Sequence, residues 1–227
     1  MSAKRRERQR EETTQEIIAT ARRQIAEQGA SALSLRGIAR QMEMTTPALY
    51  RYFENRDALV TALIVKAYQS LQEHLEAARI AHRAENPAEQ VIAVGLAYRE
   101  WALKYPEDYA LIFGTPIPGY KAPAESTLPL ARSALGVLIR VLEDGWKSGD
   151  FHLPDDPPIL SAELLSENPN GAELAPLLST ALALWSQVHG LTSLELFNHF
   201  APMLQDPAEL FRMELTNRLQ ILLKEDD

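Results

Sequence analysis

The sequence has no cysteine among its 227 residues, which excludes a disulfide framework and any site that needs thiolate ligands. It has no apolar run of the roughly 18 residues that a membrane-spanning helix requires. The N-terminal stretch MSAKRRERQR is basic, but no apolar segment follows it, so it does not resemble a secretory signal. We therefore expect a soluble protein of the cytoplasm.

The motifs of common enzyme classes are also missing. The chain contains no GxSxG elbow, no P-loop, no GxGxxG and no HExxH. None of its histidines stands three or four positions from another, the spacing that a helical metal site favours; they are His74, His82, His152, His189 and His199. We expect no enzymatic activity, no cofactor and no metal site.

Charge is unevenly distributed along the chain. The formal net charge is -8, yet residues 1–56 carry 11 Lys and Arg against 7 Asp and Glu, and the remaining residues carry 12 against 24. A basic segment on an acidic body is typical of a local site for a polyanion such as DNA, because phosphate binding needs local positive charge. The alternative is a chance fluctuation of surface charge.

Helical periodicity dominates, and we find no alternating pattern typical of a strand, so the expected fold class is all-α. The first long helix should begin between Arg8 and Thr14 and stop at Gly29. Its apolar stripe is Ile17, Ile18, Ala21 and Ile25. The basic residues before it, Lys4, Arg5, Arg6, Arg8 and Arg10, form either a disordered solvated tail or an arm that orders along DNA.

Residues 34–53 predict two short helices joined by a tight turn. Ser34 caps the first, whose apolar positions follow the i, i+3, i+4, i+7 pattern: Leu35, Ile38, Ala39 and Met42. Thr45 or Thr46 caps the second, with Pro47 in its first turn, where a missing N–H costs nothing. Leu49 and Phe53, four positions apart, should face inward.

The second of these helices is too short to be stable alone, so packing must hold it and leave its polar side outward. Hydroxyls, a phenol and a guanidinium on that side suit phosphates and base edges. The alternative is an ordinary helical hairpin whose tyrosines pack locally.

The segment Ile17 to Leu63 resembles the DNA-binding domain of the TetR family of bacterial transcriptional regulators. The resemblance is carried by four parts with their spacing intact: the helix ending at Gly29, then Ser34-Leu35-Arg36-Gly37-Ile38-Ala39, then Thr45-Thr46-Pro47-Ala48-Leu49-Tyr50-Arg51-Tyr52-Phe53, then Asn55-Arg56-Asp57-Ala58-Leu59. It implies an N-terminal three-helix helix-turn-helix domain, placed at residues 1–56, and an all-helical regulatory and dimerisation domain at residues 57–227. It also implies a homodimer on a palindromic operator.

The resemblance further implies which residues contact DNA. Those near base edges would be Thr45, Thr46, Pro47 and Ala48, and those on phosphates or flanking bases would be Arg36, Tyr50, Arg51, Tyr52 and Arg56. The chain departs from the family pattern at Glu43, where the turn usually carries glycine. If this position needs a positive φ, Glu43 is strained, and its charge lies near the DNA face.

The remaining helices are marked by capping signals. Asn55 should cap a helix that runs to about His82 and links the two domains, and Asn86 and Asp206 each precede Pro-Ala-Glu, a compact helix start. Further helices are expected over about 107–113, from Leu128 to Lys147, and over about 173–197, with a short helical piece over 159–165. The Pro- and Gly-rich stretch TPIPGYKAPAEST is either a ligand gate or a plain connector.

The last two helices are apolar on more than one face, so each needs a second burial partner besides the core of its own domain. A matching pair from a second copy, forming a four-helix bundle, is the simplest partner. We therefore expect a homodimer formed through these helices.

Aromatic residues gather on the helices of the second domain. They either fill its core or line a cavity for a small molecule. The candidate ligand-binding residues are Tyr98, Trp101, Tyr105, Phe113, Trp146, Trp185 and His189. Trp185 to Gly190 also resembles the Trp…His-Gly signature of one C-terminal domain type of the family; here His189 either donates a hydrogen bond into the cavity or, as we favour, has a structural role.

The sequence thus predicts a ligand-responsive DNA-binding regulator, a repressor released from its operator by a small apolar or aromatic effector. The alternative is a helical small-molecule-binding bundle with no specific DNA target.

Overall fold

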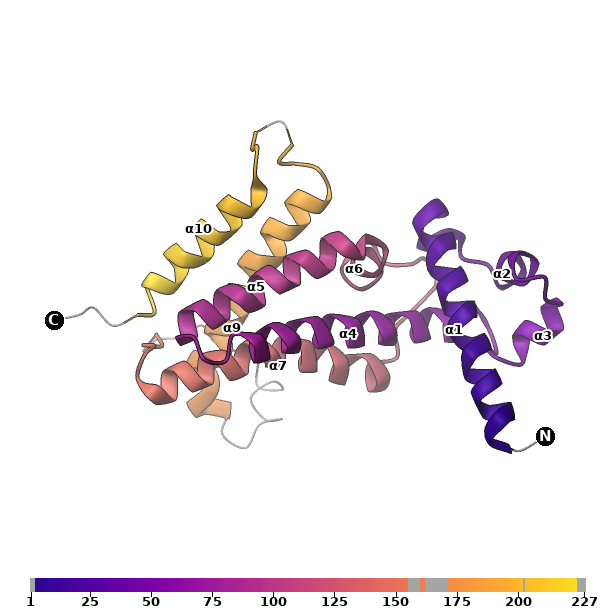
Figure 1. Ribbon diagram of the computed structural model, residues 1–227, viewed down its shortest axis with the longest axis horizontal. Coiled ribbons are helices and arrows are strands. Elements are labelled where there is room, and N and C mark those ends of the chain that lie inside the picture. Colours follow the sequence, from indigo (N-terminus) through magenta and orange to yellow (C-terminus); the bar gives the residue numbers. More distant parts are fainter. Residues whose placement is uncertain (1–2, 155–159, 162–170, 202, 224–227) are drawn as a thin grey trace. The chain divides into compact units, whose positions relative to one another are not determined.

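The computed structural model describes residues 3–154, 160–161, 171–201 and 203–223. Its helices are α1 (Ala3–Gln28), the 3₁₀ turn η1 (Ala30–Ala32), α2 (Leu35–Gln41), α3 (Thr46–Tyr50), α4 (Arg56–Ala81), α5 (Pro87–Lys104), α6 (Pro106–Phe113), α7 (Ala124–Ser148), α9 (Gly171–Leu196) and α10 (Pro207–Gln220) (Figure 1). The β structure in this part of the chain is one isolated bridge between Phe151 and Leu223. The all-α prediction is confirmed. No described helix is long and apolar enough to cross a membrane.

The predicted caps of the later helices are all in place, because each capping side chain reaches a backbone N–H within its own first turn. Asn55 Oδ1 accepts from the Ala58 N–H (2.8 Å), Asn86 Oδ1 from the Glu89 N–H (3.0 Å) and Asp206 Oδ1 from the Ala208 N–H (2.8 Å).

Two helix starts were predicted too late. Helix α1 begins at Ala3, so the basic tail is helical; its Arg, Glu and Gln residues are good helix formers, and Arg8 pairs with Glu12 at 3.1 Å. Helix α7 begins at Ala124 and continues through Pro129, where the loss of one N–H early in a long helix is tolerated. The predicted helical piece over 159–165 lies, apart from residues 160–161, outside the described residues.

The chain forms two compact units. Unit 1 comprises Met1–Gln69 and Tyr105–Leu130, and unit 2 comprises Ser70–Lys104 and Ala131–Asp227. These units do not coincide with residues 1–56 and 57–227, and that division into functional domains stays a prediction.

The core of unit 1 joins the helix-turn-helix to α6 and the segment after it. Ile17, Ile38, Leu49 and Leu63 are completely buried in it, and Ile117 from the segment 115–123 packs into the same cluster. This segment was expected to be a gate or a plain connector, but its apolar side chain makes it part of the core of unit 1.

A buried ion pair attaches α6 to α1 within unit 1. Arg22 Nε donates to Asp108 Oδ1 at 2.9 Å, and its second nitrogen lies 2.8 Å from Oδ2, a bidentate arrangement. Burial raises the pKa of the Asp108 carboxyl, and the Arg22 charge opposes this rise. Removing one partner would leave the other charge buried and unpaired, which is strongly unfavourable.

The core of unit 2 packs α5 against α9 and α10. Its fully buried members include Trp101, Leu142, Leu177, Leu184 and Leu215. Gly95 permits close packing here, because a Cβ at this position would lie only 2.7 Å from Leu215 Cδ1.

Candidate nucleic-acid interface

The start of α2 is held in place by α1. Ser34 Oγ accepts from the Gly37 N–H (3.4 Å), and the Ser34 N–H donates to Oε1 of Gln24 (3.0 Å). Gln24 is 5% exposed, and a Cβ at position 37 would lie 2.6 Å from its Nε2. The sequence analysis missed Gln24, although its place three residues after Ala21 on the buried stripe could have revealed it.

The turn between α2 and α3 is a Schellman motif. The Met44 N–H donates to the carbonyl of Ala39 (2.8 Å), and the Glu43 N–H donates to that of Arg40 (3.3 Å). Glu43 occupies the position in this motif that favours glycine, and its φ is 53°. The predicted positive φ is therefore confirmed.

Helix α3 stands on a buried base. Thr45 Oγ1 accepts from the Ala48 N–H at 3.3 Å, and Pro47 follows in the first turn, as predicted. Leu49 is completely buried and Phe53 is 8% exposed. A helix of five residues depends on this base for its stability.

The remaining side chains of the turn and of α3 are accessible. Thr45, Pro47, Tyr50 and Arg51 are exposed, with Tyr50 at 48%, whereas Thr46, Ala48 and Tyr52 are half-buried. On α2, Arg36 is exposed as expected, and so is Arg40, which the sequence analysis did not single out. Hydroxyl, phenol and guanidinium groups on a rigid base can bind phosphates and base edges.

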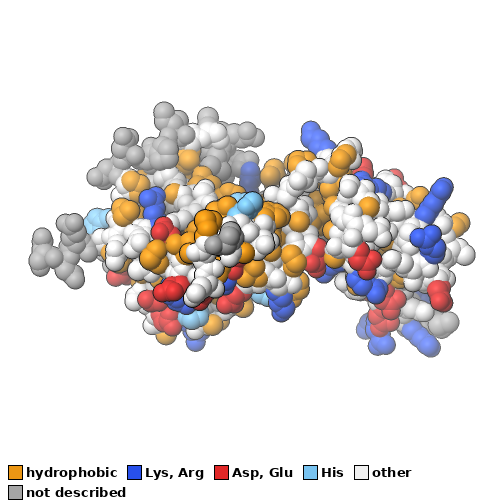
Figure 2. Space-filling view, turned by 90° about the horizontal axis from the view of Figure 1, so that it is seen from above, with side chains coloured by type: hydrophobic (Ala, Val, Ile, Leu, Met, Phe, Trp, Pro, Cys, Tyr) orange, Lys and Arg blue, Asp and Glu red, His pale blue; other side chains and the backbone are white. Residues whose placement is uncertain are grey.

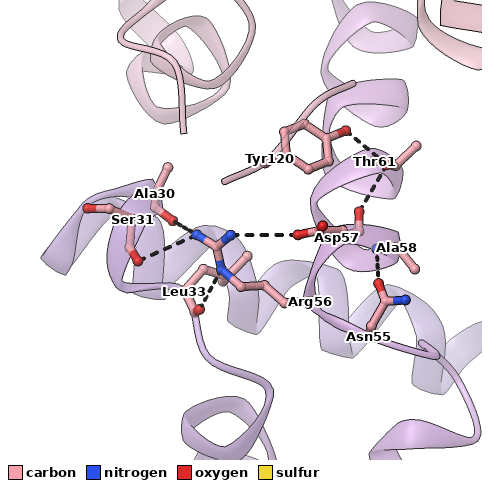
Figure 3. A network of polar contacts seen from close by, with 9 residues as sticks. All are labelled: Ala30, Ser31, Leu33, Asn55, Arg56, Asp57, Ala58, Thr61 and Tyr120. Atoms are coloured by element: carbon pink, nitrogen blue, oxygen red, sulfur yellow. Dashed lines mark hydrogen bonds and ion pairs between the residues drawn. The ribbon is translucent and has the colours of Figure 1, made fainter. Parts of the chain in front are cut away.

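Arg56 has partners other than the predicted DNA backbone (Figure 3). Its Nε donates to the carbonyl of Leu33 (3.1 Å) and its Nη2 to that of Ala30 (3.2 Å), and Asp57 lies 3.7 Å from its remaining nitrogen. The guanidinium is thus occupied by the chain between α1 and α2. This geometry does not support a DNA contact, because a phosphate would have to replace bonds already made.

In unit 2, three of the predicted ligand-binding residues form one cluster. The Tyr98 hydroxyl lies 2.9 Å from Nδ1 of His189, and the indole of Trp185 stacks on the imidazole with ring centroids 5.1 Å apart. Burial lowers the pKa of His189, so the imidazole is neutral at pH 7. Tyr98 and Trp185 also line a small apolar cavity of about 30 Å³.

The other four predicted ligand-binding residues do not join this cluster. Trp101 is completely buried, does not line the cavity, and donates from Nε1 to Ser70 Oγ at 3.1 Å. Trp146 is 37% exposed. Tyr105 and Phe113 lie in unit 1, where Phe113 contacts Tyr68 with ring centroids 6.2 Å apart. The prediction that all seven belong to the second domain was wrong, because α6 packs into unit 1.

Within the residues that the structure describes, no group of three or more His, Cys, Asp or Glu side chains is placed to hold a metal ion.

Comparison with known proteins gives the family. Residues 17–63 match the family described as bacterial regulatory proteins, tetR family, and residues 91–217 match the tetracyclin repressor-like C-terminal domain. The HTH-type transcriptional regulator Rv1816 of Mycobacterium tuberculosis is 37% identical over 207 residues, which cover 89% of this chain and 88% of that protein.

Solved structures agree with this match. The crystal structure of SCO4313, described as a regulatory protein, is 39% identical and has a TM-score of 0.75, covering 94% of this chain and 98% of that one. The TetR family regulator PfmR from Thermus thermophilus shares the fold at 18% identity, with a TM-score of 0.62 over 90% of this chain and 97% of its own. The chain therefore belongs to the TetR family, and it is a helix-turn-helix transcriptional regulator rather than an enzyme.

Proposed function

We propose that this regulator is a repressor that binds a palindromic operator as a homodimer and is released by a small apolar or aromatic effector. The observation that carries the proposal is the exposed polar face of α3 on the buried base of Leu49 and Phe53. In this proposal Thr45, Thr46, Pro47 and Ala48 lie near base edges. Arg36, Tyr50, Arg51 and Tyr52 contact phosphates or flanking bases.

The homodimer forms through α9 and α10. Both helices expose large apolar side chains although their opposite faces fill the core of unit 2: Leu194 (42% exposed), Phe197 just after α9 (54%), Met213 (49%) and Ile221 (69%). Figure 2 shows hydrophobic side chains at the surface of the unit that carries these helices. A second copy would cover them and place two α3 helices in successive major grooves, about 34–36 Å apart or a multiple of that distance.

The effector binds in unit 2 at the cluster of Tyr98, Trp185 and His189. These residues and Gly190 support the Trp…His-Gly type of C-terminal domain for this chain. A cavity of about 30 Å³ holds little more than one water molecule, so an effector must bind a rearranged state of the unit. Binding would shift the population toward a state whose α3 spacing fits the operator poorly.

DNA binding tests the proposal. A fluorescently labelled intergenic fragment from upstream of the gene should bind the protein, more weakly as salt rises. Arg51→Ala should weaken binding and lower the salt slope by about one. Arg83→Ala, which removes an exposed arginine of unit 2, is the matched control and should change neither quantity.

Tyr50→Ala separates the DNA contact from assembly. It should weaken operator binding and leave the dimer intact in sedimentation, because Tyr50 is exposed on α3. Loss of the dimer or of folding in this variant would contradict the role assigned to Tyr50. Failure to bind any fragment from the gene's own locus would favour a small-molecule-binding bundle without a specific DNA target.

A further inference from the structure

Unit 1 has a pocket of its own, with a volume of about 260 Å³. Its walls come from α4, α6, the segment between α6 and α7, and the first turn of α7. The lining residues include Ile64, Tyr68, Ile112, Pro116, Tyr120 and Thr127. The volume is slightly below the usual range for small-molecule sites, about 300–1,000 Å³, so the pocket suits a molecule with a single ring rather than a larger ligand.

The lining of this pocket carries no charge. None of the residues around it is Asp, Glu, Lys, Arg or His, and burial raises the pKa of the Tyr68 phenol, which therefore stays neutral. An ionised ligand would find no counter-charge here and would lose its hydration, which is costly. The pocket therefore selects uncharged molecules.

The polar groups of the pocket are almost all occupied. The Thr127 hydroxyl donates to the carbonyl of Pro123 (3.0 Å), and the Tyr120 hydroxyl lies 2.9 Å from Thr61 Oγ1. The Tyr68 hydroxyl has no hydrogen-bond partner among the residues that the structure describes. It is therefore the one of these three hydroxyls that is free to donate to a ligand, and its ring already contacts the edge of an aromatic neighbour, Phe113.

A chain of contacts leads from the pocket wall to the start of α2 (Figure 3). Tyr120 contacts Thr61, whose hydroxyl donates to the Asp57 carbonyl at 2.9 Å. Asp57 pairs with Arg56, and Arg56 donates to the carbonyl of Leu33, the residue before the α2 cap. A molecule that moves Tyr120 therefore acts on the element that positions the helix-turn-helix.

We propose that this pocket binds a small uncharged aromatic molecule with one hydrogen-bond acceptor, which accepts from Tyr68, and that Thr61 transmits its occupancy to the helix-turn-helix. The site is separate from the cluster of Tyr98, Trp185 and His189 in unit 2. Binding at the pocket can be tested without DNA, whereas the transmission to the helix-turn-helix rests on the proposed function.

The binding test uses three probes of similar size on the full-length protein, with affinities measured by NMR titration. Acetophenone has the ring and the acceptor, ethylbenzene lacks the acceptor, and benzoate carries a charge. Acetophenone should bind about fivefold more tightly than ethylbenzene, the worth of one neutral hydrogen bond, and benzoate should bind more weakly than both.

Variants locate the site. Tyr68→Phe should weaken acetophenone binding about fivefold and leave ethylbenzene unchanged, and Ile112→Trp should block both by filling the pocket. Tyr98→Phe, which removes the hydroxyl beside His189 in unit 2, is the matched control and should have no effect. Equal binding of benzoate, or an effect of Tyr98→Phe as large as that of Tyr68→Phe, would overturn the proposal.

Transmission is tested on the operator. Acetophenone should change the operator affinity of the wild-type protein. Thr61→Val, which removes the hydroxyl but lies outside the pocket lining, should abolish this change without altering acetophenone affinity, and Thr61→Ser should restore it. Tyr68-dependent binding with no change in operator affinity would overturn the transmission and leave the site standing; operator binding lost in all samples would instead contradict the proposed function.

Discussion

Replacing Glu43 by glycine should make the protein more stable and tighten its binding to DNA. Glu43 has a φ of 53° in the Schellman motif that ends α2. Its side chain is exposed, so the substitution removes no packing. Its backbone geometry and its charge can therefore be changed without disturbing the core of unit 1.

The expected gain in stability follows from two opposing terms. An L-residue with left-handed backbone geometry costs about 1–2 kcal/mol, and glycine offsets this gain by about 0.5–1 kcal/mol of extra unfolded-chain entropy. The net stabilisation is about 0.5–1 kcal/mol, which would raise the melting temperature of a chain of this size by about 1–4 °C. Removing a negative charge beside the DNA-facing side of α3 should tighten operator binding as well, most clearly at low salt.

Glu43→Gln separates the two effects, since it removes the charge but keeps the Cβ. It should tighten operator binding as much as Glu43→Gly, yet gain only the few tenths of a kcal/mol expected from removing an anion at a helix C-terminus. Urea unfolding gives the stabilities, and fluorescence anisotropy at two salt concentrations gives the affinities. The reasoning fails if Glu43→Gly is less stable than the wild-type protein, or if Glu43→Gln is stabilised as much as the glycine variant.

Three further substitutions test other contacts by urea unfolding. Arg56→Ala should destabilise the protein by about 1–3 kcal/mol through lost bonds to carbonyls, and Arg56→Lys should not restore it, because an ammonium lacks the guanidinium fork; full stability of the alanine variant would contradict the contacts drawn in Figure 3. Hydrogen bonds from Arg79 lower the pKa of Glu76 to about 2, so Glu76 stabilises the folded state above pH 4.5 and loses this contribution as the pH falls toward 2. Glu76→Gln should therefore cost about 1 kcal/mol or less at pH 7, given its partial exposure, and the cost should shrink between pH 4.5 and pH 3; a cost independent of pH would disprove the ion pair. Trp101→Ala should cost about 3–5 kcal/mol and the exposed Trp146→Ala about 0.5 kcal/mol or less, whereas equal costs would contradict the burial difference.

The helix-turn-helix could be predicted from the sequence because its determinants are local. Ser34, Thr45 and Asn55 each cap a helix by binding an N–H three residues later. The inward positions of α2 and α3 repeat with the helical period, which a single sequence displays directly. Even the unusual backbone at Glu43 could be predicted, since a turn of this length requires one residue with positive φ.

The start of α1 was misjudged for a different reason. The basic residues before Arg10 have no apolar partners, and the sequence analysis treated the lack of an apolar stripe as a lack of helix. Propensity and pairs one turn apart, such as Arg8 with Glu12, extend the helix beyond its buried part. An amphipathic pattern locates the buried length of a helix, which is shorter than the helix itself.

The membership of α6 and the segment after it could not be predicted, because it depends on pairs far apart in the chain. Arg22 and Asp108 are separated by 86 positions, and Thr61 and Tyr120 by 59. Neither residue of such a pair carries a local pattern that names its partner. The sequence analysis therefore assigned Tyr105 and Phe113 to the second domain by their position after α5, whereas long-range contacts place them in unit 1.

Arg56 shows the same limit within the part of the chain that was predicted best. A surface arginine beside a helix-turn-helix has the chemistry of a phosphate ligand, and the family pattern favours that role. Its guanidinium is equally suited to carbonyl oxygens, and the chain supplies those of Ala30 and Leu33 within 3.2 Å. Residue type defines what a side chain can bind, but only the positions of competing acceptors decide what it does bind. The side chains of Arg36, Tyr50 and Arg51 are exposed and make no hydrogen bond or ion pair within the described part of the chain, and they are for this reason the stronger candidates for contacts with DNA.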